Sequence, residues 1–123
     1  MKRILIVDDA ATVRLFHRTI LEHAGYEVDE AINGIEALEK ALQQTFALYL
    51  VDVNMPKLDG YGFLRELRSQ AMPQAPAIMI STEAEASDRQ RAFHAGANAY
   101  LIKPVKPEQL LLQVRLMLGD ELT

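Results

Sequence analysis

The chain has 123 residues, enough for one domain to bury most of its apolar surface around a single core. A net charge of −4 argues against a basic surface that binds nucleic acid or an anionic membrane. The absence of cysteine excludes disulfides and thiolate metal sites and agrees with a reducing cytoplasm. We therefore expect one cytoplasmic domain, residues 1–123, without a membrane span, because no apolar run approaches the roughly 18 residues that a span needs.

The first third of the chain predicts a strand, a helix and a second strand. Residues 4–7 (ILIV) are aliphatic throughout and predict a fully buried strand. A helix follows and is expected to end at Gly25. Residues 26–31 (YEVDEA) alternate in polarity, which favours an edge strand. The apolar residues of the helix recur at helical spacing: Val13, Phe16, Ile20 and Ala24.

The middle of the chain repeats this alternation. Asn33 and Glu36 form a candidate capping box for a second helix. Residues 47–51 (ALYLV) predict a second buried strand, and Asp59 is a candidate N-cap of a third helix. The apolar residues expected to pack from these helices are Ile35, Leu38, Leu42, Phe63, Leu64 and Leu67.

A fourth helix is expected between two further strands. Residues 77–80 (AIMI) predict the third fully buried strand, and Ser87 with Gln90 is a candidate capping box for the helix that follows. Phe93 is its main large apolar residue, so we expect shallow packing. The helix is expected to stop at Gly96.

The last strand is expected at residues 100–102 (YLI), and Pro107 suits the first turn of a fifth helix. Five strands that alternate with five helices predict an α/β fold, a parallel sheet covered by helices on both faces. Right-handed crossovers leave few topologies for it. The apolar stripe of the fifth helix is Leu110, Leu111, Val114 and Leu118.

Polar residues follow the buried strands, at the edge of a parallel sheet where sites usually form. In chain order they are Asp8, Asp9, Asp52, Ser81, Thr82 and Lys103. Three carboxylates in one crevice favour Mg²⁺, which prefers oxygen ligands. Zinc is disfavoured because the set contains no histidine or cysteine. Lys103 adds a positive charge that can bind a phosphate.

Four segments of the chain resemble the receiver domain of two-component response regulators. They are VDDAATVR (residues 7–14), VDVNMPKLDGYG (51–62), AIMISTE (77–83) and AGANAYLIKP (95–104). The resemblance covers essentially the whole chain and implies the flavodoxin-like, CheY-like fold with strand order 2-1-3-4-5. We expect a single receiver domain over residues 1–123, with no effector domain.

The same resemblance implies a phosphoryl and metal site. Asp52 would accept a phosphoryl group from a histidine kinase or a histidine phosphotransfer protein. Asp9 and Asp52 would bind Mg²⁺ directly, together with the backbone carbonyl of Asn54, and Asp8 would assist through water. Mn²⁺ is expected to substitute for Mg²⁺.

The hydroxyl beside the phosphoryl group would be Ser81, which lies at the strand end and fits the family spacing to Lys103; Thr82 is the alternative. Lys103 would pair with the phosphoryl oxygens, and its bond to Pro104 would be cis. Tyr100 would move inward when Ser81 engages the phosphoryl group. That movement would change the surface of the fourth helix, the last strand and the last helix, where an effector protein would bind.

The residues two positions beyond Asp52 and Ser81 are Asn54 and Glu83. In receivers these positions influence attack by water, so we expect a short-lived phosphoryl group, with the bulk of Thr82 slowing water entry. The chain would be a signalling switch that catalyses only its own phosphorylation and dephosphorylation. We expect a monomer or a weak, phosphorylation-dependent dimer of the chemotaxis or phosphorelay type.

Three other functions fit parts of the pattern. An aspartate-based phosphatase of similar fold usually has Asp-x-Asp after the first strand, but position 10 is alanine. A flavin-binding electron carrier needs a Ser/Thr/Gly-rich phosphate loop where this chain is acidic. An inactive receiver that serves as a scaffold is disfavoured by the complete set of acids, hydroxyl and lysine. The three histidines lack metal-ligand spacing and are expected at the surface or its boundary: His17, His23 and His94.

Overall fold

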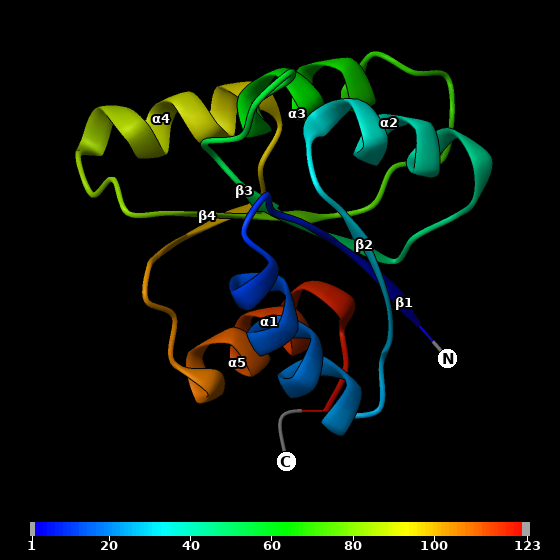
Figure 1. The fold of residues 1–123 in the computed structure, drawn as a ribbon, viewed down its shortest axis with the longest axis vertical. Helices are drawn as coiled ribbons and strands as arrows, with labels where there is room; N and C mark the ends of the chain where they lie inside the picture. Colours follow the sequence, from blue (N-terminus) through cyan, green and yellow to red (C-terminus); the bar gives the residue numbers. More distant parts are fainter. Residues whose placement is uncertain (1, 122–123) are drawn as a thin grey trace.

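The computed structural model describes residues 2–121 (Figure 1). Its strands form one parallel sheet in the order β2-β1-β3-β4-β5, which confirms the expected topology. None of the helices in this part of the chain is both long and apolar enough to cross a membrane. The strands are β1 (Arg3–Val7), β2 (Glu27–Ala31), β3 (Leu48–Asp52), β4 (Ala77–Ser81) and β5 (Ala99–Ile102). The helices are α1 (Ala11–His23), α2 (Gly34–Gln43), α3 (Gly60–Arg68), α4 (Ala86–Ala95) and α5 (Pro107–Leu118).

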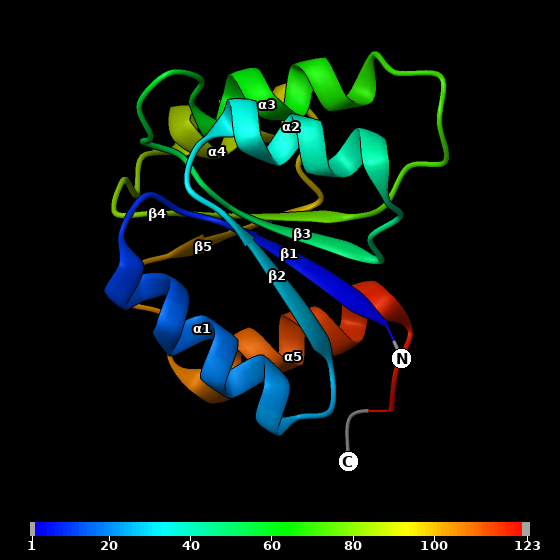
Figure 2. The same cartoon turned by 45° about the vertical axis from the view of Figure 1, so that its right-hand side comes forward.

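Helices cover both faces of the sheet. Figures 1 and 2 show α1 and α5 on one face and α2, α3 and α4 on the other. Successive strand residues point to opposite faces, so Ile4 and Ile6 pack toward α1 and α5, and Leu5 and Val7 belong to the opposite core. A strand buried on both faces must be apolar throughout, which explains the sequences of β1, β3 and β4.

Two of the three predicted N-caps are confirmed, but the predicted box at Asn33 is only half formed, because the Glu36 side chain accepts from the Ile32 amide at 3.1 Å. The side chain of Asn33 accepts a hydrogen bond from the Glu36 amide, and that of Asp59 accepts one from the Gly62 amide, both at 2.8 Å. The third prediction, a capping box of Ser87 and Gln90, is wrong. The helix starts two residues earlier than that box requires, because Asp88 accepts a hydrogen bond from the Glu85 amide at 3.1 Å.

The buried face of α1 differs from the predicted stripe. His17 and Leu21 are buried, whereas Phe16 is 48% exposed. The prediction that His17 lies at the surface is therefore wrong, although His23 and His94 are exposed as expected. Burial lowers the pKa of His17, and the positive charge of Lys103 lowers it further, while Asp8 opposes the shift.

The fully buried residues of α2 and α4 are small, although Leu38 of α2 packs against the core as predicted. Ala37 and Ala41 are buried in α2, where Ile35 and Leu42 are exposed. The first residue of α2 lies tightly against the loop after β3, because a Cβ at Gly34 would lie 2.4 Å from the Leu58 carbonyl oxygen. The buried residues of α4 are Ala92 and Ala95, and Phe93 is 49% exposed. The expected shallow packing of α4 is confirmed, but its contacts with the core come from the two alanines and not from Phe93.

Candidate functional site

Three charged side chains from different strands meet at the carboxyl edge of the sheet. Asp8 directly follows β1, Asp52 ends β3 and Lys103 directly follows β5. The Lys103 Nζ atom lies 3.0 Å from Asp52 Oδ1 and 3.1 Å from Asp8 Oδ2. Both carboxylates are buried, so a single ammonium group bonds two acids that are largely removed from water.

Asp9 adds a third carboxylate to this group. Oxygen atoms of Asp8, Asp9 and Asp52 all lie within 4.8 Å of one another, and Asp9 is the exposed member. We call these three acids and Lys103 the acidic site. When all four are ionised, the site keeps an excess of negative charge. Its donor set consists of carboxylate oxygens, which fits a hard divalent cation such as Mg²⁺.

Burial and charge act on the acidic site in opposite directions. Burial raises the pKa of Asp52, and the negative charges of Asp8 and Asp9 raise it further, while the hydrogen bond from Lys103 opposes the shift. Burial alone would lower the pKa of Lys103, but its bonds to Asp52 and Asp8 outweigh burial and raise it. The neighbouring carboxylates therefore favour the charged form of Lys103, whereas burial and the adjacent acids disfavour the charged form of Asp52.

The loop after β3 folds tightly back on the strand that carries Asp52. The Gly60 amide donates a hydrogen bond of 2.9 Å to the Val53 carbonyl. A Cβ at position 60 would lie 2.3 Å from the Asp52 carbonyl oxygen, so only glycine fits. Lys57 takes a left-handed conformation with φ of 70° to complete the turn. The exposed Asn54 stands at the start of this loop, two residues beyond Asp52.

The two candidate hydroxyls have different surroundings. Ser81 is buried at the end of β4, and its Oγ accepts a hydrogen bond of 3.1 Å from the Glu83 amide. Thr82 is exposed and lines an open apolar pocket together with Phe16, Lys103 and Pro104. The peptide bond between Lys103 and Pro104 is cis.

The sequence matches the model of the family described as "Response regulator receiver domain" over residues 4–115. The chain belongs to this receiver family. Its curated relatives include the transcriptional regulatory protein ResD of Bacillus subtilis, 38% identical over 116 residues, or 94% of this chain and 48% of that protein. SrrA of Staphylococcus aureus is 36% identical over 115 residues, or 94% of this chain and 47% of that protein. The chain thus spans about half the length of these relatives.

Solved receiver structures resemble this one closely. The chemotaxis protein CheY4 of Vibrio cholerae superposes with a TM-score of 0.90 at 36% identity, over 95% of this chain and 98% of that one. The receiver domain of the sensor histidine kinase PA1611 of Pseudomonas aeruginosa has a TM-score of 0.89 at 32% identity, over 97% of this chain and 98% of that one. That structure has a magnesium ion coordinated in its active site cleft.

Tyr100 of this receiver domain already points inward. Its side chain is 5% exposed, and its hydroxyl donates a hydrogen bond of 2.8 Å to the Glu83 carbonyl. The Arg89 guanidinium lies 5.4 Å from the centre of the ring. We expected the inward position to follow phosphorylation. The inward position is present here because the Glu83 carbonyl accepts a hydrogen bond from the Tyr100 hydroxyl, and Arg89 of α4 packs over the ring.

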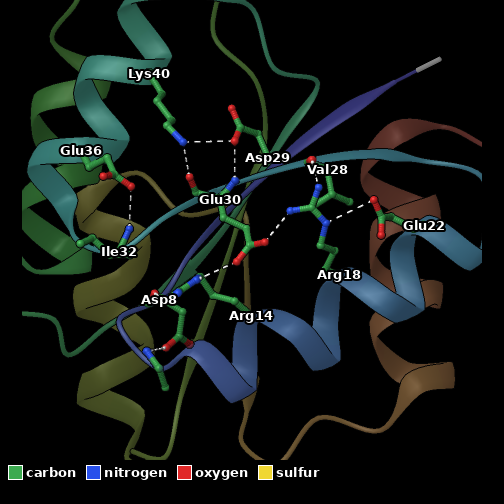
Figure 3. Close-up of polar contacts among 11 residues, drawn as sticks. Asp8, Arg14, Arg18, Glu22, Val28, Asp29, Glu30, Ile32, Glu36 and Lys40 are labelled. Atoms are coloured by element: carbon green, nitrogen blue, oxygen red, sulfur yellow. Dashed lines mark hydrogen bonds and ion pairs between the residues drawn. The ribbon is translucent and has the colours of Figure 1, made fainter.

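Sequence reasoning missed a second charged cluster of the receiver domain, beside the acidic site. Figure 3 shows two arginines of α1 on one carboxylate of β2, and we call these residues, Arg14, Arg18 and Glu30, the arginine network. Arg14 Nε lies 2.7 Å from Glu30 Oε1, and Arg18 donates to Glu30 Oε2. The available signal was the arginine that ends VDDAATVR, but its partner lies 16 residues away in the chain.

Proposed function

We propose that this receiver domain is a phospho-accepting switch in which Asp52 takes a phosphoryl group from a histidine kinase or a histidine phosphotransfer protein. The observation that carries the proposal is the cluster of three carboxylates within 4.8 Å, of which Asp8 and Asp52 also bond Lys103. Such a cluster suits phosphoryl transfer, because catalysis of this reaction consists mainly of positioning and charge neutralisation. The domain would catalyse only its own phosphorylation and dephosphorylation.

A divalent cation would occupy the acidic site. Asp9 and Asp52 would hold Mg²⁺ directly with the backbone carbonyl of Asn54, Asp8 would reach it through water, and Mn²⁺ would substitute. When bound, the ion neutralises negative charge on the transferred group and on the neighbouring acids. The excess negative charge of the acidic site supports this assignment.

In the transfer step, a carboxylate oxygen of Asp52 attacks the phosphorus of a phosphohistidine. A phosphorus–oxygen bond forms as the phosphorus–nitrogen bond breaks, and the released imidazole takes up a proton from solvent. Lys103 stays in place and pairs with one phosphoryl oxygen. Ser81 donates its hydroxyl to another, with Thr82 as the alternative donor. The burial of Ser81 next to the site supports the first choice.

The signal would leave the site through Ser81 and Tyr100. The Glu83 backbone links the two residues, because its amide donates to Ser81 and its carbonyl accepts from Tyr100. Movement of the Ser81 hydroxyl onto the phosphoryl group would therefore act on Tyr100 and on the surface of α4, β5 and α5, where an effector protein would bind. The side chains of Asn54 and Glu83 would set how fast water removes the phosphoryl group, which we expect to be short-lived.

Mass spectrometry after treatment with phosphoramidate, a small phosphodonor, tests the proposal. Wild type should gain one phosphoryl group on Asp52 with Mg²⁺ present and none with EDTA. Asp9→Ala should lose this labelling more completely than Asp8→Ala, since only Asp9 is a direct ligand. Full labelling of Asp52→Ala, or equal labelling of wild type in EDTA, would contradict the proposal.

A further inference from the structure

Arg14 lies one turn into α1 and reaches back to the acidic end of β1 (Figure 3). Its Nη1 donates a hydrogen bond of 2.7 Å to the backbone carbonyl of Asp8. That carbonyl is part of the peptide bond that joins Asp8 to Asp9. Arg14 therefore acts on the two neighbouring acids through the backbone that carries them.

The two acids depend on this backbone to different degrees. The Asp8 carboxylate has partners of its own, since Oδ1 accepts from the Ala10 amide at 2.9 Å and Oδ2 from Lys103 at 3.1 Å. Asp9 is exposed, so the direction of its carboxylate depends on the peptide before it. Ala10, the N-cap residue of α1, has no polar side chain with which to fix this turn. Besides the Asp8 carboxylate, Arg14 is the side chain that bonds the backbone of this turn.

Arg14 is itself held in a fixed orientation. Its Nε lies 2.7 Å from Glu30 Oε1, and its side chain is only 14% exposed. Glu30 in turn accepts from Arg18, which also donates to the Val28 carbonyl at 3.1 Å. The carboxylates of Glu30 and Glu22 offset the positive charges of Arg14 and Arg18. Arg14 can therefore stand behind the acidic site with little repulsion of a cation.

We propose that Arg14 is a positioning residue for the metal site: oriented by Glu30, it fixes the Asp8–Asp9 peptide and thereby the direction of the Asp9 carboxylate. The inference rests on the proposed function, in which Asp9 is a direct ligand. Partners that orient a metal ligand from behind typically change metal affinity by about 10–100-fold when they are removed. Arg14 would thus affect metal binding without touching the ion.

Isothermal titration of the full chain with Mg²⁺ tests this, with thermal unfolding in EDTA measured in parallel. Arg14→Met should weaken Mg²⁺ binding by about tenfold. Arg14→Lys keeps the charge and one donor, so its loss should be smaller. The matched control is Arg18→Met, which removes a Glu30 partner from the same helix but no bond to Asp8. It should lower the unfolding temperature while leaving Mg²⁺ affinity unchanged.

Wild-type affinity in Arg14→Met, or equal losses in Arg14→Met and Arg18→Met, would overturn the proposal. If Arg14→Met does not fold, Glu30→Gln carries the test, because it loosens Arg14 without removing it. Weakened Mg²⁺ binding by Glu30→Gln supports the proposal, and wild-type affinity overturns it. Failure of the proposed function would look different, because wild type itself would then bind no Mg²⁺, and this inference would fall with it.

Discussion

The acidic site and the arginine network lie on either side of the end of β1, and they balance their charges in opposite ways. In the acidic site one ammonium faces three carboxylates, and burial together with Asp8 and Asp9 raises the pKa of Asp52. In the arginine network two guanidinium groups face one carboxylate. Burial opposes ionisation of Glu30, but the hydrogen bonds from Arg18 and Arg14 outweigh it and lower its pKa. The first cluster has an excess of negative charge and can receive a cation, whereas in the second Arg18 also pairs with Glu22, so that two carboxylates balance two guanidinium groups.

Removing the one cation of the acidic site should have the largest effect on stability. Lys103→Met leaves Asp8 and Asp52 buried without their ammonium partner, and we expect a loss of about 2–3 kcal/mol in the free energy of unfolding when Mg²⁺ is absent. Urea unfolding in EDTA measures the loss. Lys106→Met, at an exposed lysine three residues further on, is the control. Equal effects of the two substitutions would contradict the view that Lys103 compensates the buried acids.

Removing one acid from the same site should raise the free energy of unfolding instead of lowering it. Asp52→Asn relieves the repulsion among the three carboxylates, and we expect it to raise the free energy of unfolding by about 1 kcal/mol in EDTA at pH 7. The pKa of Asp52 in the folded protein is raised above the ordinary 3.8. The destabilising charge of Asp52 therefore appears as pH rises through that folded pKa.

The difference in free energy of unfolding between Asp52→Asn and wild type should therefore grow as pH rises from about 3.8 through the folded pKa of Asp52, and it should vanish in more acidic solution. Urea unfolding at a series of pH values follows it. Glu39→Gln, at an exposed carboxylate of α2, serves as the control and should show little difference from wild type. A destabilised Asp52→Asn at pH 7 would show that the acidic site is already balanced without a metal ion.

Removing the carboxylate of the arginine network should lower the free energy of unfolding, whereas removing that of Asp52 should raise it. Glu30→Gln weakens the bonds to Arg14 and Arg18, and we expect a loss of about 1 kcal/mol at pH 7. Because the folded pKa of Glu30 is lowered below the ordinary 4.5, its contribution is present above that value and is lost as pH falls through the folded pKa. The control is Glu27→Gln, which breaks an exposed pair with Arg3 and should have a smaller effect in the same unfolding experiment. An equal loss for Glu27→Gln and Glu30→Gln would show that the arginine network contributes no more to stability than an exposed ion pair does.

The strands could be predicted from the residue pattern and their order from the family resemblance, whereas the faces of three helices could not be predicted. A strand buried on both sides is apolar without interruption, so residues 4–7 and 77–80 were easy to identify. Helix faces depend on how closely each helix approaches the sheet. Apolar spacing predicts that Phe16 and Leu42 are buried, but His17 and Ala41 take the buried positions in the structure.

Members of the acidic site were predictable because each lies at the end of a strand or just beyond it, and parallel strands bring their ends together. Asp8, Asp52 and Lys103 meet as expected from this rule. The arginine network was not predictable in the same way. The bond from Arg14 to Glu30 joins a helix side chain to an edge-strand side chain, and no local pattern in the sequence specifies which carboxylate a long arginine will reach.

The acidic site carries an excess of negative charge that a bound Mg²⁺ ion should neutralise. Unfolding measured at different Mg²⁺ concentrations tests this most directly. The free energy of unfolding should be measured for wild type and Asp9→Asn over a series of Mg²⁺ concentrations. Wild type should gain about 2.7 kcal/mol at a concentration 100 times its dissociation constant. Asp9→Asn should gain far less at the same concentration, because it has lost a direct ligand. An equal gain in both proteins, or no gain in wild type, would contradict the account.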